Sequence, residues 1–195
     1  MEKKRFFTTR MIAVTGVLTA IEVILQLIGN HIGTININLS LIPICLGAIL
    51  YGPFVGGFLG LVCGAIVIAS PSTSYYFMPV DPLGTIITCL VKTTVAGVVA
   101  GFVMKLFKEH KLAGAITISI LVPVINTGIF AIFVEIFFRK MLEDIVTGGL
   151  FSNTTAALFM GMIGINFIIE VMSTPILVPS IYKIVESQSK NKSIE

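Results

Sequence analysis

The sequence predicts an all-α membrane protein, a six-transmembrane-helix bundle with both termini in the cytoplasm. Of its 195 residues, 55% are apolar and only 12% are charged, and the mean hydropathy is +1.01. A soluble domain carries about a quarter of charged residues, so this chain has too little polar surface to face water on all sides. Long apolar runs and a one-sided distribution of lysine and arginine then predict the number of spans and their orientation.

The apolar runs predict a single membrane domain over residues 1–195, with short polar tails at about 1–7 and 186–195. The expected helices cover residues 8–29, 40–51, 54–69, 83–107, 112–137 and 155–184. A single helix over residues 40–69 would reach ~45 Å and overshoot the hydrocarbon core. We therefore expect a break at Gly52 and Pro53, because proline favours the first turn of a helix and restricts the residue before it.

The connections between these helices predict the orientation. Ten lysine and arginine residues flank the side that holds both termini, whereas the opposite side holds only Arg139 and Lys140. The positive-inside rule places the termini in the cytoplasm. Residues 30–39, 70–82 and 139–154 are then the connections on the outer face, and all three are longer and more polar than the turn at Gly52 and Pro53. Long polar connections outside and a tight turn inside are typical of a protein that collects a solute from outside.

Four ionisable residues lie inside the expected spans: Glu22, Lys92, Glu135 and Glu170. Each costs about 2.5 to 3.5 kcal/mol in a lipid environment, so such side chains are expected to face a cavity or one another. Glu22 and Glu135 lie close to the outer boundary, where a solvated or a packing role is expected.

Lys92, Asn126, Asn166 and Glu170 lie deeper, about 14 to 23 Å from the outer ends of their helices. We expect them to converge on one polar substrate pocket near the middle of the membrane. Asn166 and Glu170 are spaced i, i+4 and share a helix face. The alternative is structural, since a buried asparagine can simply bind a neighbouring helix and a lysine can pair with a glutamate.

Two outer connections contribute further candidates for substrate binding, Asn38 and Tyr75. Tyr75, together with Tyr76 and Phe77, could cover a flat ligand, although tyrosine is enriched at any membrane interface. Asp81 precedes a proline and is expected to cap the next helix.

Small residues form a second pattern. Ala13, Gly16 and Ala20 recur along the first expected helix, and glycines recur along residues 54–69 and 83–107. Such residues let helices approach closely. The face on the first helix could instead remain smooth for docking of a partner protein.

Several functions are disfavoured by the residues. His31 and His110 lie near opposite membrane faces, so no catalytic or metal cluster is expected, and the chain is not expected to be an enzyme. Cys45, Cys63 and Cys89 lie in apolar runs and indicate no disulfide, metal or cofactor. The net charge of +3 reflects orientation and not nucleic-acid binding. No phosphate-binding loop occurs, so energy must come from a partner or an ion gradient.

Three stretches carry a family resemblance: residues 38–64 (NLSLIPICLGAILYGPFVGGFLGLVCG), Asn126 with Thr127, and residues 164–182 (GINFIIEVMSTPILVPSIY). The chain resembles the substrate-binding S components of bacterial energy-coupling factor (ECF) vitamin transporters, in the group that includes pantothenate binders. The resemblance implies a six-helix bundle in the bacterial plasma membrane that binds a micronutrient tightly. It also implies partners, a transmembrane coupling subunit with two ATPases, and no ATP hydrolysis by this chain.

The resemblance also assigns roles. Family members dock through an Ala-xxx-Ala face on the first helix. This sequence departs from that pattern at Val17, four residues after Ala13, but Gly16 and Ala20 form a pair of small residues at the same spacing. Lys92 stands where related sequences often have arginine. Lysine keeps the positive charge but lacks the planar guanidinium group that binds a carboxylate through two parallel hydrogen bonds. Pantothenate is favoured as substrate, with folate and riboflavin open. Two other functions remain: a proton-coupled transporter that uses Glu170, and a structural subunit.

Overall fold

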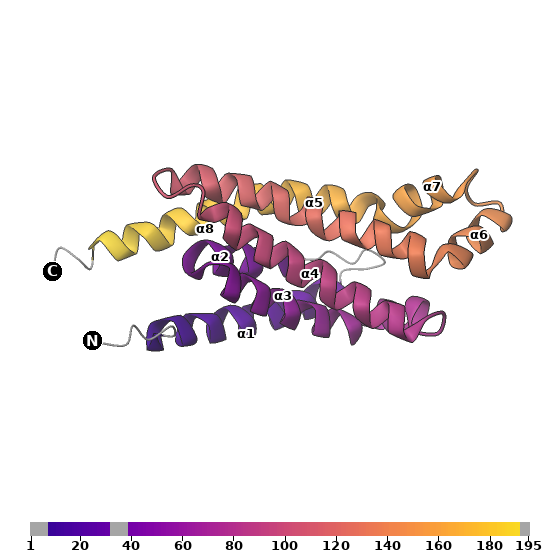
Figure 1. Cartoon of the computed structure of the whole chain (residues 1–195), viewed down its shortest axis with the longest axis horizontal. Coiled ribbons are helices and arrows are strands. Elements are labelled where there is room, and N and C mark those ends of the chain that lie inside the picture. Colours follow the sequence, from indigo (N-terminus) through magenta and orange to yellow (C-terminus); the bar gives the residue numbers. More distant parts are fainter. Residues whose placement is uncertain (1–7, 32–38, 192–195) are drawn as a thin grey trace.

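The computed structural model describes residues 8–31 and 39–191, which form an elongated bundle of helices without strands in that part of the chain (Figure 1). The helices are α1 (Thr9–His31), α2 (Leu41–Tyr51), α3 (Pro53–Ile68), α4 (Pro82–Met104), α5 (Lys111–Phe137), α6 (Arg139–Thr147), α7 (Thr154–Ala156) and α8 (Gly164–Asn191). Two π-helical turns, η1 (Thr73–Phe77) and η2 (Ala157–Ile163), complete the described structure.

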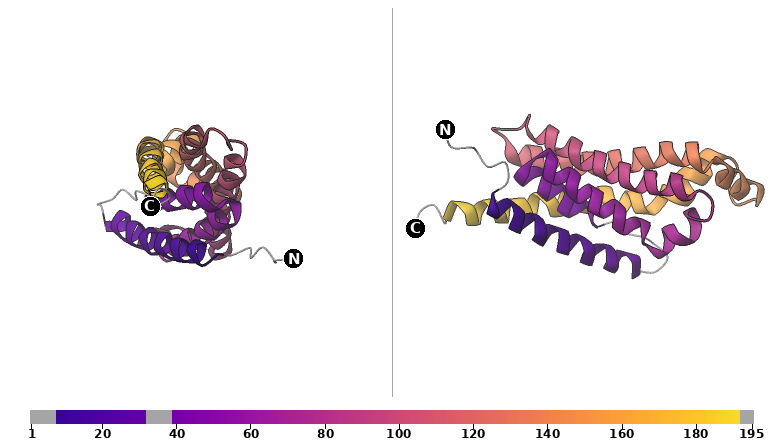
Figure 2. Two further views of the ribbon diagram at one scale, coloured as in Figure 1. Left: turned by 90° about the vertical axis from the view of Figure 1, so that its left-hand side faces the viewer. Right: turned by 60° about the horizontal axis from the view of Figure 1, so that its bottom comes forward.

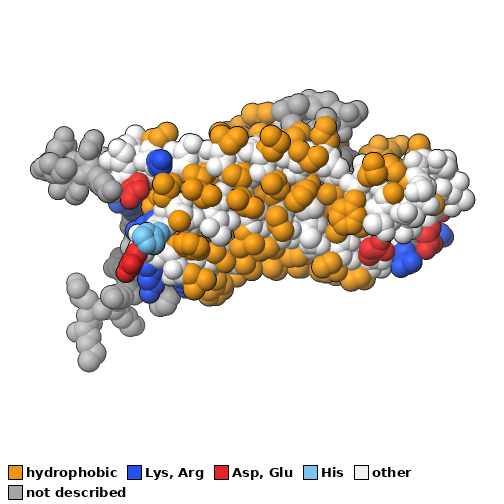
Figure 3. Space-filling model, turned by 90° about the horizontal axis from the view of Figure 1, so that it is seen from above, with side chains coloured by type: hydrophobic (Ala, Val, Ile, Leu, Met, Phe, Trp, Pro, Cys, Tyr) orange, Lys and Arg blue, Asp and Glu red, His pale blue; other side chains and the backbone are white. Residues whose placement is uncertain are grey.

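The predicted all-α membrane fold is confirmed. Four helical stretches, Thr9–Gly29, Pro82–Met104, Lys111–Phe137 and Thr154–Gln188, are long and apolar enough to cross a bilayer, and α2 and α3 are shorter apolar helices. Charged side chains gather at the two ends of the molecule and the flank between them is largely apolar (Figure 3). The number of six spans and the side of the termini stay predictions.

The division between α2 and α3 occurs where the sequence predicts it. Gly52 has a φ of +87°, a conformation that glycine adopts without strain, and Pro53 is the first residue of α3. The start of α1 and the end of α8 lie at the same end of the bundle, and α1 lies at its periphery (Figures 1 and 2). This arrangement agrees with an even number of crossings.

Glycines bring α3 and α4 into direct backbone contact. A Cβ atom at Gly56 would overlap the carbonyl oxygen of Gly97, and one at Gly60 would overlap that of Thr93. These residues therefore serve helix packing. The core behind them is formed largely by α2, in which Leu41, Ile44, Cys45 and Ala48 are fully buried.

The connection at residues 139–154 contains a short helix, which the sequence analysis did not specify. Residues 139–147 form α6, an amphipathic helix whose Leu142 is fully buried beside Phe138 in a second apolar cluster. Apolar residues at helical spacing give this short segment a face to bury. Residues 70–82 likewise contain η1, while Asp81 caps α4 as expected, its carboxylate accepting a bond from the Gly84 amide at 2.9 Å.

The expected single helix over residues 155–184 is interrupted, which corrects the sequence prediction. Gly164 has a φ of +22° and separates η2 from α8. Only glycine tolerates such geometry readily, so the break is encoded locally. The polar tail expected from residue 186 continues instead as helix through Asn191. Asn166 and Glu170 consequently lie in the first two turns of α8, directly after the break.

Candidate functional site

A cavity of about 450 Å³ lies between the helices toward the end of the bundle that carries α6. Its walls come from α4, α5, α6, α8 and both π-helical turns, with Gln26 reaching it from α1. Cavities of roughly 300 to 1,000 Å³ are typical of small-molecule sites. The volume therefore suits a ligand of micronutrient size.

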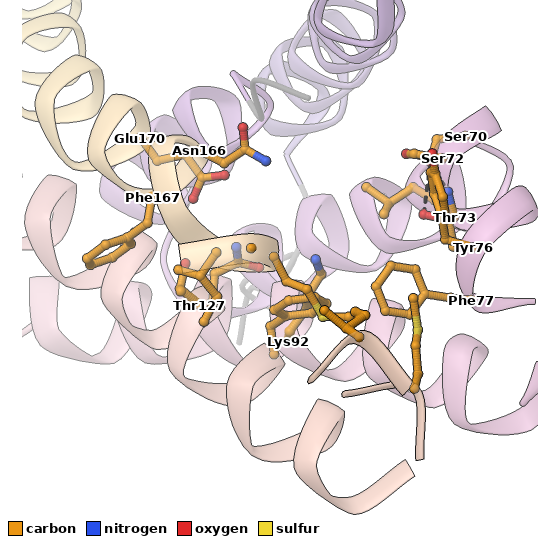
Figure 4. A pocket seen from close by; sticks show the side chains of 18 of the residues that line it. Ser70, Ser72, Thr73, Tyr76, Phe77, Lys92, Thr127, Asn166, Phe167 and Glu170 are labelled. Carbon is orange, nitrogen blue, oxygen red and sulfur yellow. Dashed lines mark hydrogen bonds between the residues drawn. The ribbon is translucent and has the colours of Figure 1, made fainter. Parts of the chain in front are cut away.

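The four deep polar residues of the sequence analysis all line this cavity. Lys92 comes from α4, Asn126 from α5, and Asn166 and Glu170 from α8. Asn166 and Glu170 lie side by side because residues four apart share a helix face (Figure 4). The structure thus brings together residues that are far apart in the sequence, while their role as ligand contacts stays a prediction.

Three of these side chains keep an oxygen atom without a partner. Asn126 Oδ1, Asn166 Oδ1 and Glu170 Oε2 are buried and have no hydrogen-bond partner among the described residues. The Glu170 backbone carbonyl, in contrast, accepts a hydrogen bond from the Thr174 hydroxyl. Most buried polar groups in proteins are paired, and an unpaired one costs about 1 to 3 kcal/mol. A ligand in the cavity would supply the missing donors.

Lys92 faces an aromatic ring and not a carboxylate. Its Nζ atom lies 4.9 Å from the centroid of the Phe130 ring, within the range of a cation–π interaction. Within the part of the chain that the structure describes, Lys92 forms no ion pair with Glu170 or another acid within 4.0 Å. The structural lysine–glutamate pair considered above is therefore absent from this region. The ammonium charge remains available to a ligand.

Aromatic side chains form much of the remaining wall: Tyr76, Phe77, Phe130, Phe151 and Phe167. Phe77 packs edge-on against Phe130, with ring centroids 6.0 Å apart, and against Phe138 at 5.2 Å. Sequence analysis did not single out Phe130, Phe151 or Phe167. The spacing of Phe130, four residues after Asn126, was the available signal.

Tyr75 is not among the residues that line the cavity, and its predicted role in covering a ligand stays a prediction. Its side chain is 75% exposed, and its ring packs edge-on against Tyr76 with centroids 5.0 Å apart. Tyr76 and Phe77 are the residues of this segment that reach the cavity. The π-helical turn η1 decides this, because it sets which consecutive side chains point inward. Asn38 lies outside the described residues.

A small hydroxyl cluster supports η1 at the cavity wall. The Ser70 hydroxyl donates to the Val67 carbonyl oxygen at 2.7 Å and lies within hydrogen-bond distance of Thr73 Oγ1, at 2.9 Å. Ser70, Ser72 and Thr73 all line the cavity, and none of them was singled out in the sequence. The bonds hold the turn that presents Tyr76 and Phe77.

The two shallower acids differ from each other. Glu135 is partly exposed and its Oε2 lies 3.8 Å from Arg139 Nη1, in agreement with the expected solvated role. Glu22 is 0% exposed, which agrees with the packing role and not with the solvated role among the two that were expected. Neither carboxylate oxygen of Glu22 has a hydrogen-bond partner among the described residues. One turn further along α1, Gln26 Oε1 accepts a bond of 2.7 Å from the Ser40 hydroxyl.

The small residues of α1 face outward. Ala13, Gly16 and Ala20 are exposed, and a Cβ atom at Gly16 would meet no heavy atom within 4 Å. This face is thus unused in packing of the described bundle, unlike the glycines of α3 and α4. Docking of a partner on it stays a prediction.

The comparison with protein families completes the description of the site. The family model for the ECF transporter substrate-specific component matches residues 10–182. The chain belongs to this family. It is a family of transporter components and not of enzymes, and its members work with ECF coupling and ATPase subunits and a small-molecule substrate. No relative was found among curated proteins or solved structures.

Proposed function

We propose that this chain is the high-affinity binding subunit for uptake of a vitamin or related micronutrient across the bacterial plasma membrane. The observation that carries the proposal is the cavity of about 450 Å³, which holds unpaired polar side chains inside an apolar bundle. Membership of the ECF substrate-specific family supports the same function. Pantothenate is the proposed substrate on local sequence likeness, with folate and riboflavin as alternatives.

Each polar group in the cavity has a role in this proposal. Lys92 supplies a positive charge, and Asn126, Asn166 and Glu170 supply hydrogen bonds that fix the orientation of the substrate. Aromatic rings cover its apolar parts. Tyr76 is the best placed of the three aromatic residues expected to cover the ligand, since it lines the cavity and is 56% exposed at the surface.

The transport step depends on partners. The chain binds substrate, and the energy comes from ATP hydrolysed by two ATPase subunits that act through a transmembrane coupling subunit. We propose that the exposed face of Ala13, Gly16 and Ala20 on α1 docks on the coupling subunit. A smooth surface of small residues permits close contact between helices. The apolar flank seen in Figure 3 would let the bundle reorient in lipid without burying charges.

Mass spectrometry of small molecules bound to the protein, purified from its native membrane, tests this function and names the substrate. We expect one micronutrient at a near-stoichiometric amount, and calorimetry with that compound should give a dissociation constant well below micromolar. Uptake by cells should require the coupling and ATPase subunits. A purified protein without any bound small molecule would support a purely structural subunit instead.

A proton-coupled transporter is the second candidate. The observation in its favour is Glu170, a carboxyl group that is only 6% exposed and has one oxygen without a partner among the described residues. Such a group could take up and release a proton during transport. This function requires accumulation of solute by the chain alone, without ATPases.

A further inference from the structure

The two charged side chains of the cavity constrain the chemistry of its ligand. We infer that the ligand carries an anionic group, a carboxylate or phosphate, that binds Lys92, and separate N–H or O–H donors that bind Glu170. This inference rests on the proposed function, because it assigns a substrate class to the same cavity. It favours an acidic, donor-bearing micronutrient over a cationic or an uncharged one.

Lys92 requires the anionic group. An ammonium can only donate hydrogen bonds, so its partner in the cavity must be an acceptor. Its contact at 4.9 Å is with the Phe130 ring, and it has no carboxylate partner in the described region. A cation in a membrane-embedded site is normally paired. An anionic group on the ligand would complete this pairing and would exploit the strength of charge-assisted hydrogen bonds.

Glu170 requires the donors. An ionised carboxylate can only accept hydrogen bonds, and Glu170 Oε2 is buried without a donor among the described residues. Lys92 lines the same cavity as Glu170, yet the two form no ion pair within 4.0 Å in the described part of the chain. A ligand between them would meet a donor at one end and an acceptor at the other.

Asn126 and Asn166 do not discriminate between ligand classes by themselves. An amide side chain can turn to present its oxygen or its nitrogen, so these residues adapt to either kind of partner. They lie on α5 and α8 and add hydrogen bonds along the length of the ligand. The selectivity for an acid with donors therefore comes from Lys92 and Glu170.

A panel of compounds that differ in charge and in donors tests this inference. The protein is freed of bound small molecules and titrated by calorimetry with pantothenate and biotin, which combine a carboxylate with N–H or O–H donors. Lipoate has a carboxylate without such donors, riboflavin has donors without an anionic group, and thiamin is a cation. We expect pantothenate or biotin to bind at least a hundredfold more tightly than lipoate, riboflavin and thiamin. Tightest binding of lipoate, riboflavin or thiamin would overturn the inference.

Matched analogues separate the two ends of the ligand. The alcohol panthenol replaces the carboxylate of pantothenate, and an alcohol analogue of biotin does the same. Whichever of pantothenate and biotin binds should bind the unmodified protein at least tenfold more tightly than its alcohol analogue. In Lys92→Met this difference in affinity should be less than twofold. An unchanged preference in Lys92→Met would overturn the assignment of the anionic group to Lys92.

The compound released from natively purified protein extends the test beyond the panel. If no panel member binds, that compound is identified by mass spectrometry and titrated instead. A bound compound without an anionic group, or without N–H and O–H donors, overturns this inference and leaves the proposed function intact. A protein that releases no compound and binds no panel member overturns the proposed function itself.

Discussion

Lys92 and Glu170 line the same cavity from α4 and α8, yet no ion pair within 4.0 Å joins them in the described part of the chain. A direct ion pair would have satisfied both charges within the protein. The separation instead favours a site in which a third molecule contacts both groups.

Replacement of Lys92 by alanine should weaken ligand binding at least tenfold, about 1.4 kcal/mol, because an anionic group would lose its charged partner. Lys92→Arg keeps the charge and should retain most of the affinity. Calorimetry on the purified variants measures both. Equal dissociation constants for Lys92→Ala and the unmodified protein would contradict this role.

Gly16→Leu should spare ligand binding and abolish uptake, because a bulky side chain would disturb the proposed docking face. Gly128→Leu on α5 is the matched control, since Gly128 is also an exposed helical glycine with no heavy atom within 4 Å of an added Cβ. The control should retain binding and uptake. Calorimetry and cell uptake are measured in parallel, and equal uptake by the two variants would argue against docking at Gly16.

Gly60→Ala should destabilise the protein, because the new methyl group would overlap the Thr93 backbone where α3 and α4 meet. Overpacking of this kind costs about 1 to 3 kcal/mol. The buried thiols of Cys45 and Cys63 allow the measurement, since a thiol-reactive dye labels them only on unfolding. Gly16→Ala serves as control and should leave the unfolding temperature unchanged. An unchanged temperature for Gly60→Ala would show that the helices can separate without loss.

Glu22→Met should raise the unfolding temperature in the same assay. Glu22 is 0% exposed and its carboxylate oxygens have no partner among the described residues, so an apolar side chain of similar length removes an unpaired polar group. The expected gain is about 1 to 3 kcal/mol. Ligand binding should change little. A lower unfolding temperature would reveal a stabilising partner for the carboxyl group.

Vesicles that contain this chain alone should not accumulate substrate under a proton gradient. Vesicles that also contain the coupling and ATPase subunits should accumulate it when ATP is supplied. Glu170→Gln tests the proton-coupled alternative directly, because it removes the titratable group and keeps the shape. Gradient-driven accumulation by the chain alone that disappears in Glu170→Gln would favour that alternative.

Part of the cavity could be predicted because a polar residue in an apolar run is conspicuous. Lys92, Asn126, Asn166 and Glu170 are costly in lipid, so their positions along the helices predict a shared interior site. Phe130 and Phe167 could not be recognised in this way. A phenylalanine in an apolar run has the same sequence environment whether it faces lipid, a neighbouring helix or a ligand.

The sequence by itself determined the helical membrane class and the local breaks, because mean hydropathy and the backbone preferences of Gly52 and Pro53 act within a few residues. Only the tertiary structure decided which faces meet. The small residues of α1 are exposed, whereas similar glycines on α3 and α4 are in backbone contact. Tyr75 and Tyr76 are likewise adjacent, yet only Tyr76 lines the cavity, whose other walls come from helices distant in the chain. These outcomes depend on neighbours that are distant in the chain, and no local sequence pattern specifies them.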